Sequence, residues 1–211
     1  AAYYKCPAIG GDIVEANLED IRKLPGIVDA FIIKGNGNER QLLSGVAVVG
    51  DSTWAVFDAE KKLKIIWDNS NASKDSWSGL VETAKKLEGG EGDNLVYNKG
   101  DVVQAFADKS NKIIEGSYSY SFVAHLCLEP MNCTASYRFG SGGEKDSIEI
   151  WAPTQSPSSI APAIKEIYGI EQDRIIVNVT RMGGGFGRRF SSEFVFEAAE
   201  ISRHMRCPIK L

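Results

Sequence analysis

The stretch RIIVNVTRMGGGFGRRFSSEFVFEAAEISRHM, at residues 174–205, places a strand, a glycine-rich loop and a helix in direct succession. Its first part, Arg174 to Val179, is apolar and rich in β-branched residues, which predicts a buried strand. Its last part predicts a helix from Ser192 to Met205, because Ser192 is a favoured N-cap residue and Glu193 puts an acid in the first turn. The sequence therefore predicts a strand-loop-helix unit with the glycines at its turn.

Glycine fills four of the five positions from Gly183 to Gly187, with Phe186 as the exception. Without a Cβ the backbone can approach a ligand closely, and its free amides can surround an anion. Arg188 and Arg189 follow directly and add forked donors suited to phosphate or carboxylate. The loop is therefore predicted to hold an anionic cofactor, and the alternative is a flexible turn whose arginines are only solvated.

Two common nucleotide-binding motifs do not fit this loop. A Walker A loop ends in Lys followed by Ser or Thr, and neither is present here. The dinucleotide fingerprint Gly-x-Gly-x-x-Gly fails as well, because its third glycine would fall on Arg188 or Phe190. A phosphate- or nucleotide-binding module that uses the loop in another way stays open as an alternative.

A second segment is LCLEPMNCTA, residues 126–135, in which Glu129 precedes a proline within an otherwise apolar stretch. Such an acid is either a surface charge at a strand end or a buried carboxylate with a task. His125, Cys127 and Cys133 are near one another in sequence, but their spacing matches no common zinc motif. No side chain of this chain is therefore predicted to ligate a metal.

The third segment is WAPTQSP, residues 151–157, where a strand runs into a turn bracketed by prolines before a helix. Gln155 offers an uncharged donor and an uncharged acceptor at a strand end, where binding residues concentrate. The plain alternative is that Thr154 or Ser156 only caps the following helix.

Composition excludes several classes of protein. The chain has 211 residues, of which 43% are hydrophobic, with 21 Gly and 7 Pro, so disordered and collagen-like chains are excluded. Its 24 basic and 28 acidic side chains are interspersed and give a net charge of -4, so nucleic acid and anionic membranes are not expected partners. No apolar run approaches the roughly 20 residues that a bilayer span needs. Four cysteines are too few for a disulfide-built domain, so we expect reduced thiols. The chain is expected to be soluble, in the periplasm or the cytoplasm.

Hydrophobic patterning predicts short strands and helices along the rest of the chain. The expected strands are residues 3–9, 28–33, 45–49, 63–67, 113–122 and 148–151, with the start of another at 207–211. The expected helices are residues 17–24, 77–87, 101–107 and 158–168, with one more beginning at residue 53. Polar residues and glycines dominate 68–98, and the run at 89–92 breaks the chain. We therefore expect an α+β fold with mixed short sheets covered by helices. The expected domain organisation is one unit at 1–75, a linker at 76–95 and a second unit at 96–211.

Together and in this order, the three segments resemble the molybdenum hydroxylases of the xanthine oxidase and aldehyde oxidase family. The resemblance is strongest to the large (beta) subunit of isoquinoline 1-oxidoreductase-like enzymes. The matching motifs are LEPMNCTA (128–135), WAPTQS (151–156) and RMGGGFGRRF (181–190). Upstream, YKCPAIGG (4–11) and GVAVVGDSTWAV (45–56) resemble the α/β-hammerhead domain of that family. The resemblance covers essentially the whole chain and implies a hammerhead domain followed by the first part of a molybdopterin-binding domain with mixed sheet and flanking helices.

This resemblance implies a cofactor and partners. The family binds molybdenum through molybdopterin, often as a cytosine dinucleotide, and hydroxylates an N-heterocycle or an aldehyde with oxygen from water. Electrons leave through [2Fe-2S] clusters, which in this branch are carried by a separate small subunit. The implied partners are therefore the remainder of the large subunit and this iron–sulfur subunit, and the isolated chain is expected to be inactive.

The resemblance also implies roles for single residues. Gln155 would hydrogen-bond an oxo ligand of molybdenum, and Glu129 is implied as a pocket residue. The cofactor would be held by Gly184, Gly185, Phe186, Gly187 and Arg188. The general base of the family is a Glu in a Gly-Glu segment that has no match in this sequence, so no base is assigned. A non-catalytic interaction domain is the remaining alternative.

Overall fold

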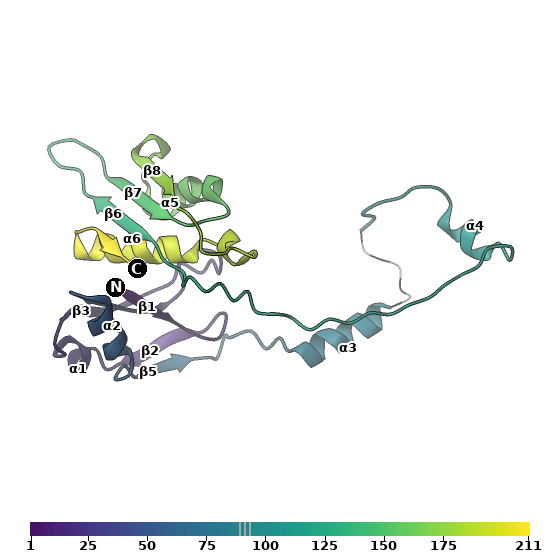
Figure 1. Ribbon diagram of the computed structural model, residues 1–211, viewed down its shortest axis with the longest axis horizontal. Helices are drawn as coiled ribbons and strands as arrows, with labels where there is room; N and C mark the ends of the chain where they lie inside the picture. The colour runs from purple at the N-terminus through teal and green to yellow at the C-terminus, as the bar shows by residue number, and fades with distance from the viewer. Residues whose placement is uncertain (89, 91, 93) are drawn as a thin grey trace. The chain divides into compact units, whose positions relative to one another are not determined.

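The computed structural model describes residues 1–88, 90, 92 and 94–211. The chain break expected at 89–92 and the linker expected at 76–95 include residues 89, 91 and 93, which lie outside the described residues. The chain divides into two compact units, one made of residues 1–73 and 125–211 and the other of residues 74–124 (Figure 1). Helices and strands are interspersed along the chain, and the strands form three short sheets among the described residues, so the predicted α+β class is confirmed.

The first part of the larger unit holds two small antiparallel sheets. One has the order β1-β4-β3, with β1 at Ala2–Lys5, β4 at Gly45–Gly50 and β3 at Ile27–Ile33. The other pairs β2 at Asp12–Ala16 with β5 at Ile65–Asp68, and the helices are α1 at Leu18–Arg22 and α2 at Thr53–Glu60. The Ser52 side chain caps α2 by accepting a hydrogen bond from the Ala55 amide.

The second part of this unit is a mixed sheet of order β8-β7-β6-β9. Its strands are β6 at Thr134–Arg138, β7 at Ser147–Ala152, β8 at Ile175–Val179 and β9 at Ile209–Lys210. Strands β7 and β8 are parallel, whereas β6 is antiparallel to both β7 and β9. The helical elements are η1 at Pro157–Ser159, α5 at Ile160–Tyr168, η2 at Gln172–Arg174, η3 at Arg188–Phe190 and α6 at Glu193–Met205.

Helix α6 is the centre of the larger unit and lies between its mixed sheet and the β1-β4-β3 sheet (Figure 1). It packs against β6 and β7, and its Phe194, Ala198 and Ile201 are buried. From the other sheet, the ring of Phe31 stacks on His204 with ring centroids 3.7 Å apart. Buried residues of both parts form one apolar cluster, so the two parts share a core.

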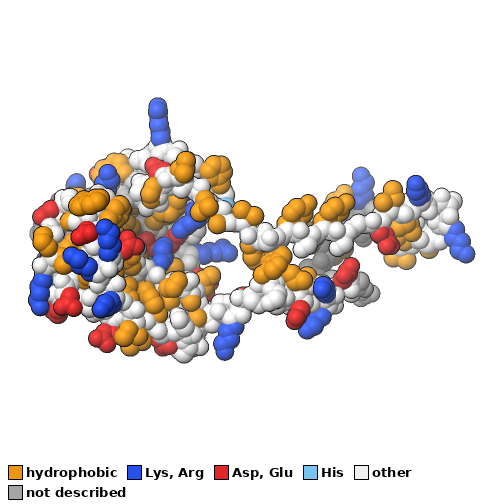
Figure 2. Space-filling model, turned by 60° about the horizontal axis from the view of Figure 1, so that its bottom comes forward, with side chains coloured by type: hydrophobic (Ala, Val, Ile, Leu, Met, Phe, Trp, Pro, Cys, Tyr) orange, Lys and Arg blue, Asp and Glu red, His pale blue; other side chains and the backbone are white. Residues whose placement is uncertain are grey.

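The smaller unit holds the two helices that its sequence predicts, α3 at Trp77–Leu87 and α4 at Val102–Ala107. Ser76 and Asp101 cap them by accepting hydrogen bonds from the amides of Gly79 and Gln104, at 3.1 and 2.9 Å. None of the described residues in this unit is buried, and apolar side chains gather on its surface (Figure 2). No described helix of the chain combines the length and the apolar character that a membrane crossing requires.

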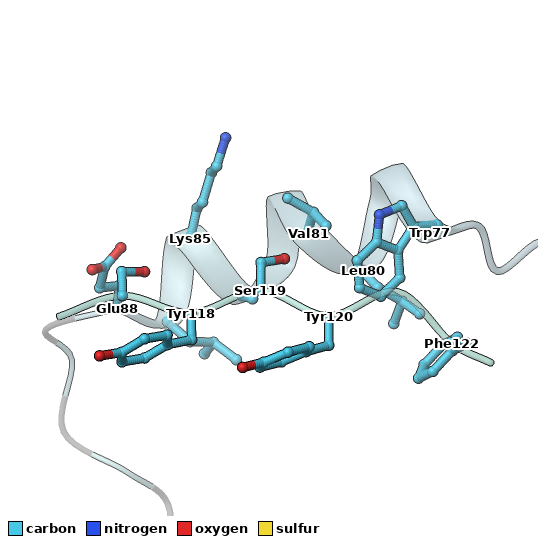
Figure 3. Close-up of a pocket in the computed structure, with 12 residues that line it drawn as sticks. Trp77, Leu80, Val81, Lys85, Glu88, Tyr118, Ser119, Tyr120 and Phe122 are labelled. Carbon is cyan, nitrogen blue, oxygen red and sulfur yellow. The ribbon is translucent and has the colours of Figure 1, made fainter.

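The strand predicted at 113–122 is wrong. These residues are exposed and form no strand, although Tyr118, Tyr120 and Phe122 do point to one side, away from Ser119, beside α3 (Figure 3). A period of two decides which side chains share a side, but a strand also needs a neighbour for its backbone donors and acceptors. Within the described part of the chain, no strand pairs with this segment.

Two strands of the structure, β2 and β6, are not predicted from the sequence. Strand β6, whose sequence TASYR alternates polar and apolar residues over only five positions, has three consecutive buried residues because it is a central strand between β7 and β9. Strand β2 is short and contains the exposed residues Val14 and Glu15. The strand predicted at 3–9 ends at Lys5, and the helix predicted at 158–168 begins with the turn η1.

Candidate cofactor site

The sheet brings the three sequence segments to one edge. Strands β7 and β8 are parallel, with Ala152 level with Val179, so the chain leaves both strands at the same edge. Strand β6 is antiparallel to β7 and starts level with Trp151, so residues 125–133 arrive at that edge too. The carboxyl ends of parallel strands are a common place for ligands.

Gln155 lies directly against the glycine loop. Its Oε1 accepts a hydrogen bond of 3.1 Å from the Gly187 amide, and the backbone amide of Gln155 donates to the Arg189 carbonyl at 3.0 Å. A Cβ placed on Gly185 would lie 2.7 Å from the same Oε1, so the glycine makes room for this side chain. Because the Oε1 is already bonded, the exposed side chain presents its Nε2 group as a donor.

Arg189, whose forked donors the sequence marks as suited to phosphate or carboxylate, lies inside the protein. Its side chain is fully buried, and its Nη2 pairs with the Glu129 Oε2 at 2.6 Å and bonds the Glu129 carbonyl at 3.0 Å. Its Nε donates to the Gly184 carbonyl at 2.8 Å, and its Nη1 donates to the Pro153 carbonyl at 3.4 Å. The guanidinium thus joins all three segments from inside the protein. Its forked donors indicated a carboxylate partner, and that partner belongs to the chain itself.

Glu129 is placed at the first glycine of the loop. Its Oε2 accepts a 2.8 Å hydrogen bond from the Gly183 amide in addition to the bond from Arg189. A Cβ on Gly183 would lie 2.6 Å from the Glu129 Cβ, which explains the glycine there. One oxygen of the carboxylate is therefore committed to holding the loop.

Three successive amides of the loop are left for a ligand. Among the hydrogen bonds of the described residues, none has the amide of Gly184, Gly185 or Phe186 as its donor. Gly184 and Gly187 have φ of +100° and +88°, and Phe186 between them has φ of 51°. Left-handed residues of this kind turn backbone amides toward a common point and make a concavity for an anion. The geometry therefore fits a negatively charged group.

Arg188 turns its side chain away from that concavity. Its guanidinium pairs with Glu193 of α6, while its amide donates to the Gly185 carbonyl at 2.9 Å. Burial alone would raise the pKa of Glu193, but the hydrogen bond from Arg188 and the charges of Lys5 and Arg188 hold this pKa below its ordinary value. Arg188 therefore contributes its backbone to the loop and its charge to α6.

A buried charge cluster lies behind the loop. Lys5 of β1 pairs with Glu197 at 2.6 Å and lies 3.5 Å from Glu193, and both carboxylates are almost fully buried. Burial raises the pKa of Glu197, and the charge of Lys5 opposes this shift. Within the described residues, no three His, Cys, Asp or Glu side chains are grouped so that they could hold a metal ion.

A family model described as the molybdopterin cofactor-binding domain matches residues 87–211. The chain belongs to this family. The match takes in all three segments of the site, and the prediction of the molybdenum hydroxylase family is confirmed.

Curated relatives of this molybdopterin cofactor-binding domain are much longer proteins. The membrane-bound aldehyde dehydrogenase [pyrroloquinoline-quinone] of Gluconacetobacter polyoxogenes is 27% identical over 96% of this chain and 25% of its own length. Xanthine dehydrogenase/oxidase of Mus musculus is 28% identical over 76% of this chain and 12% of its own length. The chain thus spans a quarter or less of these relatives.

Solved structures share the fold of the molybdopterin cofactor-binding domain. Quinoline 2-oxidoreductase from Pseudomonas putida 86 matches 99% of this chain and 30% of its own, with a TM-score of 0.66 and 19% identity. Aldehyde oxidoreductase from Desulfovibrio gigas matches 100% of this chain and 26% of its own, with a TM-score of 0.68 and 17% identity.

Proposed function

We propose that this chain is part of the large subunit of a molybdopterin-dependent oxidoreductase and that its glycine loop holds the cofactor. The observation that carries this proposal is the set of unpaired amides of Gly184, Gly185 and Phe186. Molybdopterin is an anion, and unpaired amides on a turned backbone are donors that suit an anionic oxygen. When bound, the cofactor would supply the two-electron redox chemistry that hydroxylates a substrate with oxygen from water.

In this proposal Gln155 orients the cofactor as a neutral donor. The Gly187 amide fixes the Oε1 of Gln155, so the Nε2 group is held in position before the cofactor binds. A donor that is already in place costs no reorganisation when the reaction begins, and removing such a donor slows enzymes markedly. Gly185 leaves the space in which this side chain lies.

Glu129 acts in the proposal as a positioning residue and not as a proton acceptor. Its Oε2 is bonded both to Arg189 and to the Gly183 amide, so this oxygen is already occupied by partners within the chain. Arg189 in turn holds the Gly184 carbonyl. The pair therefore keeps the loop in the shape that leaves its amides exposed.

We propose an N-heterocycle or an aldehyde as the substrate. The names quinoline 2-oxidoreductase and aldehyde oxidoreductase point to an N-heterocycle or an aldehyde as substrate. A cavity of 570 Å³, lined in part by Gly187, Phe190, Ser156 and Arg40, opens beside the loop and has the size of a small-molecule site. We further propose a cytosine dinucleotide form of the cofactor, an iron–sulfur subunit as electron acceptor, a hammerhead-like domain at 1–75, a cofactor-binding domain from 96 onward, and no activity of the isolated chain.

Two glycines with nearly the same positive φ angle allow a direct test. Gly184 has φ +100° and lies in the loop, whereas Gly143 has φ +94° in the β6–β7 hairpin with open space around it. In the complete subunit purified with its cofactor, Gly184→Ala should lose most bound molybdenum and pterin, because its Cβ would lie 2.7 Å from the Phe186 ring. Gly143→Ala should retain both and serves as the matched control.

The same measurements separate the competing cofactors. Molybdenum and fluorescent pterin in the wild-type protein support the proposal, and equal cofactor content in both variants would contradict it. A redox-active quinone without molybdenum would indicate the cofactor named for the Gluconacetobacter relative. Calorimetric binding of ATP at micromolar concentration without molybdenum would favour a nucleotide-binding module.

A further inference from the structure

Alternate residues of the segment 125–129 meet alternate glycines of the loop. The two run in opposite directions, with the pairs His125 with Gly187, Cys127 with Gly185, and Glu129 with Gly183. The pairing is regular: moving two residues forward in the segment 125–129 corresponds to moving two residues backward in the glycine loop. The residues between them, Leu126 and Leu128, are 84% and 100% exposed. Every second side chain of the segment thus contacts the loop.

Each contact has its own chemistry. The Glu129 carboxylate accepts from the Gly183 amide at 2.8 Å, and the Cys127 thiol donates to the Gly185 carbonyl at 3.4 Å. At the far end, a Cβ on Gly187 would lie 3.4 Å from the His125 Nε2, an ordinary van der Waals distance, so the imidazole lies beside that glycine.

The contacts explain how a glycine loop keeps unpaired amides. A glycine-rich backbone has many accessible conformations, and most of them would let its amides find partners within the chain. Here the Gly183 amide is bound by Glu129 and the Gly187 amide by Gln155. The Gly185 carbonyl accepts from the Cys127 thiol at 3.4 Å in addition to the Arg188 amide at 2.9 Å. The loop is thus held at both ends and in its middle. The amides of residues 184–186, which lie between these ends, stay directed to the concavity.

We propose that His125, Cys127 and Glu129 form a clamp that positions the cofactor loop, with Cys127 as its central positioning residue. The clamp acts on the backbone and not on the reacting atoms. Its role in cofactor binding rests on the proposed function, but its existence as a clamp does not. The experiment therefore has one readout without the cofactor and one with it.

The first readout is hydrogen exchange of the loop amides in the 211-residue chain without cofactor. Cys127→Val keeps the side-chain volume close but removes the donor. Exchange of the Gly183 and Gly187 amides, the loop amides that are bonded to Glu129 and Gln155, should then rise severalfold and at most about tenfold, the range for losing one hydrogen bond. Cys127→Ser should restore slow exchange, because its hydroxyl donates to the same carbonyl. Leu128→Val, on the exposed side of the segment, is the matched control and should change nothing.

The second readout uses the complete subunit loaded with molybdopterin. Cys127→Val should change the electron paramagnetic resonance signature of the molybdenum centre and lower kcat at unchanged molybdenum content, and Cys127→Ser should restore both. Glu129→Gln serves as the second variant of the clamp and should raise loop exchange as well.

The outcomes distinguish the two proposals. Equal loop exchange in Cys127→Val, Glu129→Gln and Leu128→Val would overturn the clamp, whatever cofactor the protein holds. A subunit that takes up no molybdopterin but shows the expected exchange pattern would overturn the proposed function and leave the clamp in place.

Discussion

Gln155 and Gly185 act as one unit at the scale of single residues. The side chain of Gln155 occupies the space that a Cβ on Gly185 would need, with Oε1 and Cδ only 2.7 and 2.8 Å away from it. These atoms are the flexible end of a side chain and can be displaced more easily than backbone. Alanine at 185 should therefore harm the site mainly by moving Gln155.

A double-mutant cycle tests this coupling in the cofactor-loaded subunit. Gln155→Ala should lower kcat roughly 100-fold, the usual effect of removing one preorganised donor. Gly185→Ala should have a similar effect, and the double variant should be about as slow as either single variant, since residues in contact are not additive. Gly79→Ala, whose Cβ would meet only the Ser76 hydroxyl at 3.1 Å, is the control. Multiplicative losses in the double variant would show that the two residues act independently.

Sequence reasoning finds some of these residues and misses others for a physical reason. The glycines and Gln155 stand out because their types are unusual at a strand end. Arg189 stands out as a donor for phosphate or carboxylate, but its partner is not predicted, because Glu129 lies 60 positions earlier in the chain. The clamp is missed as well, since a spacing of two in His125, Cys127 and Glu129 has meaning only beside the glycine loop.

Helix α6 carries two buried carboxylates one turn apart that behave oppositely. Lys5 and Arg188 act on both Glu193 and Glu197, but Arg188 bonds Glu193 directly. The pKa of Glu193 is therefore lowered from its ordinary value of 4.5, whereas burial raises the pKa of Glu197 above 4.5. Two neighbouring positions of one helix thus differ in the sign of their contribution to stability.

The difference predicts opposite pH dependences of stability. Ionised Glu193 stabilises the fold above pH 4.5, and this contribution is lost as the pH falls through its lowered folded-state pKa. For Glu197 the contribution is full below pH 4.5 and is lost as the pH rises through its raised folded-state pKa. In urea unfolding from about pH 4 to about pH 7, Glu197→Gln should gain stability relative to the wild type with rising pH, and Glu193→Gln should lose it. The same slope for both variants would contradict the assignment.

At the scale of elements, the sequence predicts helices better than strands. Helices α2 and α3 are marked by local signals, a capping Ser before each, so their starts are predictable. Strand pairing is not local: the segment 113–122 has a strand pattern but no neighbour among the described strands, whereas β6 has a pattern of only five residues and pairs with both β7 and β9. A strand is therefore decided by residues far away in sequence.

At the scale of the whole molecule, the core joins residues that are far apart in the chain. Residues 1–75 contain an apolar cluster of their own around Ile21 and Val46, and their Phe31 and Val49 also belong to the cluster that includes Ile150 and Phe194. The smaller unit, residues 74–124, contributes no buried residue among those described. Stability of the larger unit should therefore depend little on an intact chain between its two parts.

Limited proteolysis tests this expectation. Trypsin should cut first within the smaller unit, for example after the exposed residues Lys99, Lys109 or Lys112, because chain without buried residues opens easily. The two large fragments should then stay together on size exclusion, since α6 packs against the β1-β4-β3 sheet and Lys5 of one fragment pairs with Glu197 of the other. The same nicked sample in urea should separate into its fragments and serves as the control. Separation without urea would mean that the linking segment, and not the shared core, holds the two parts together.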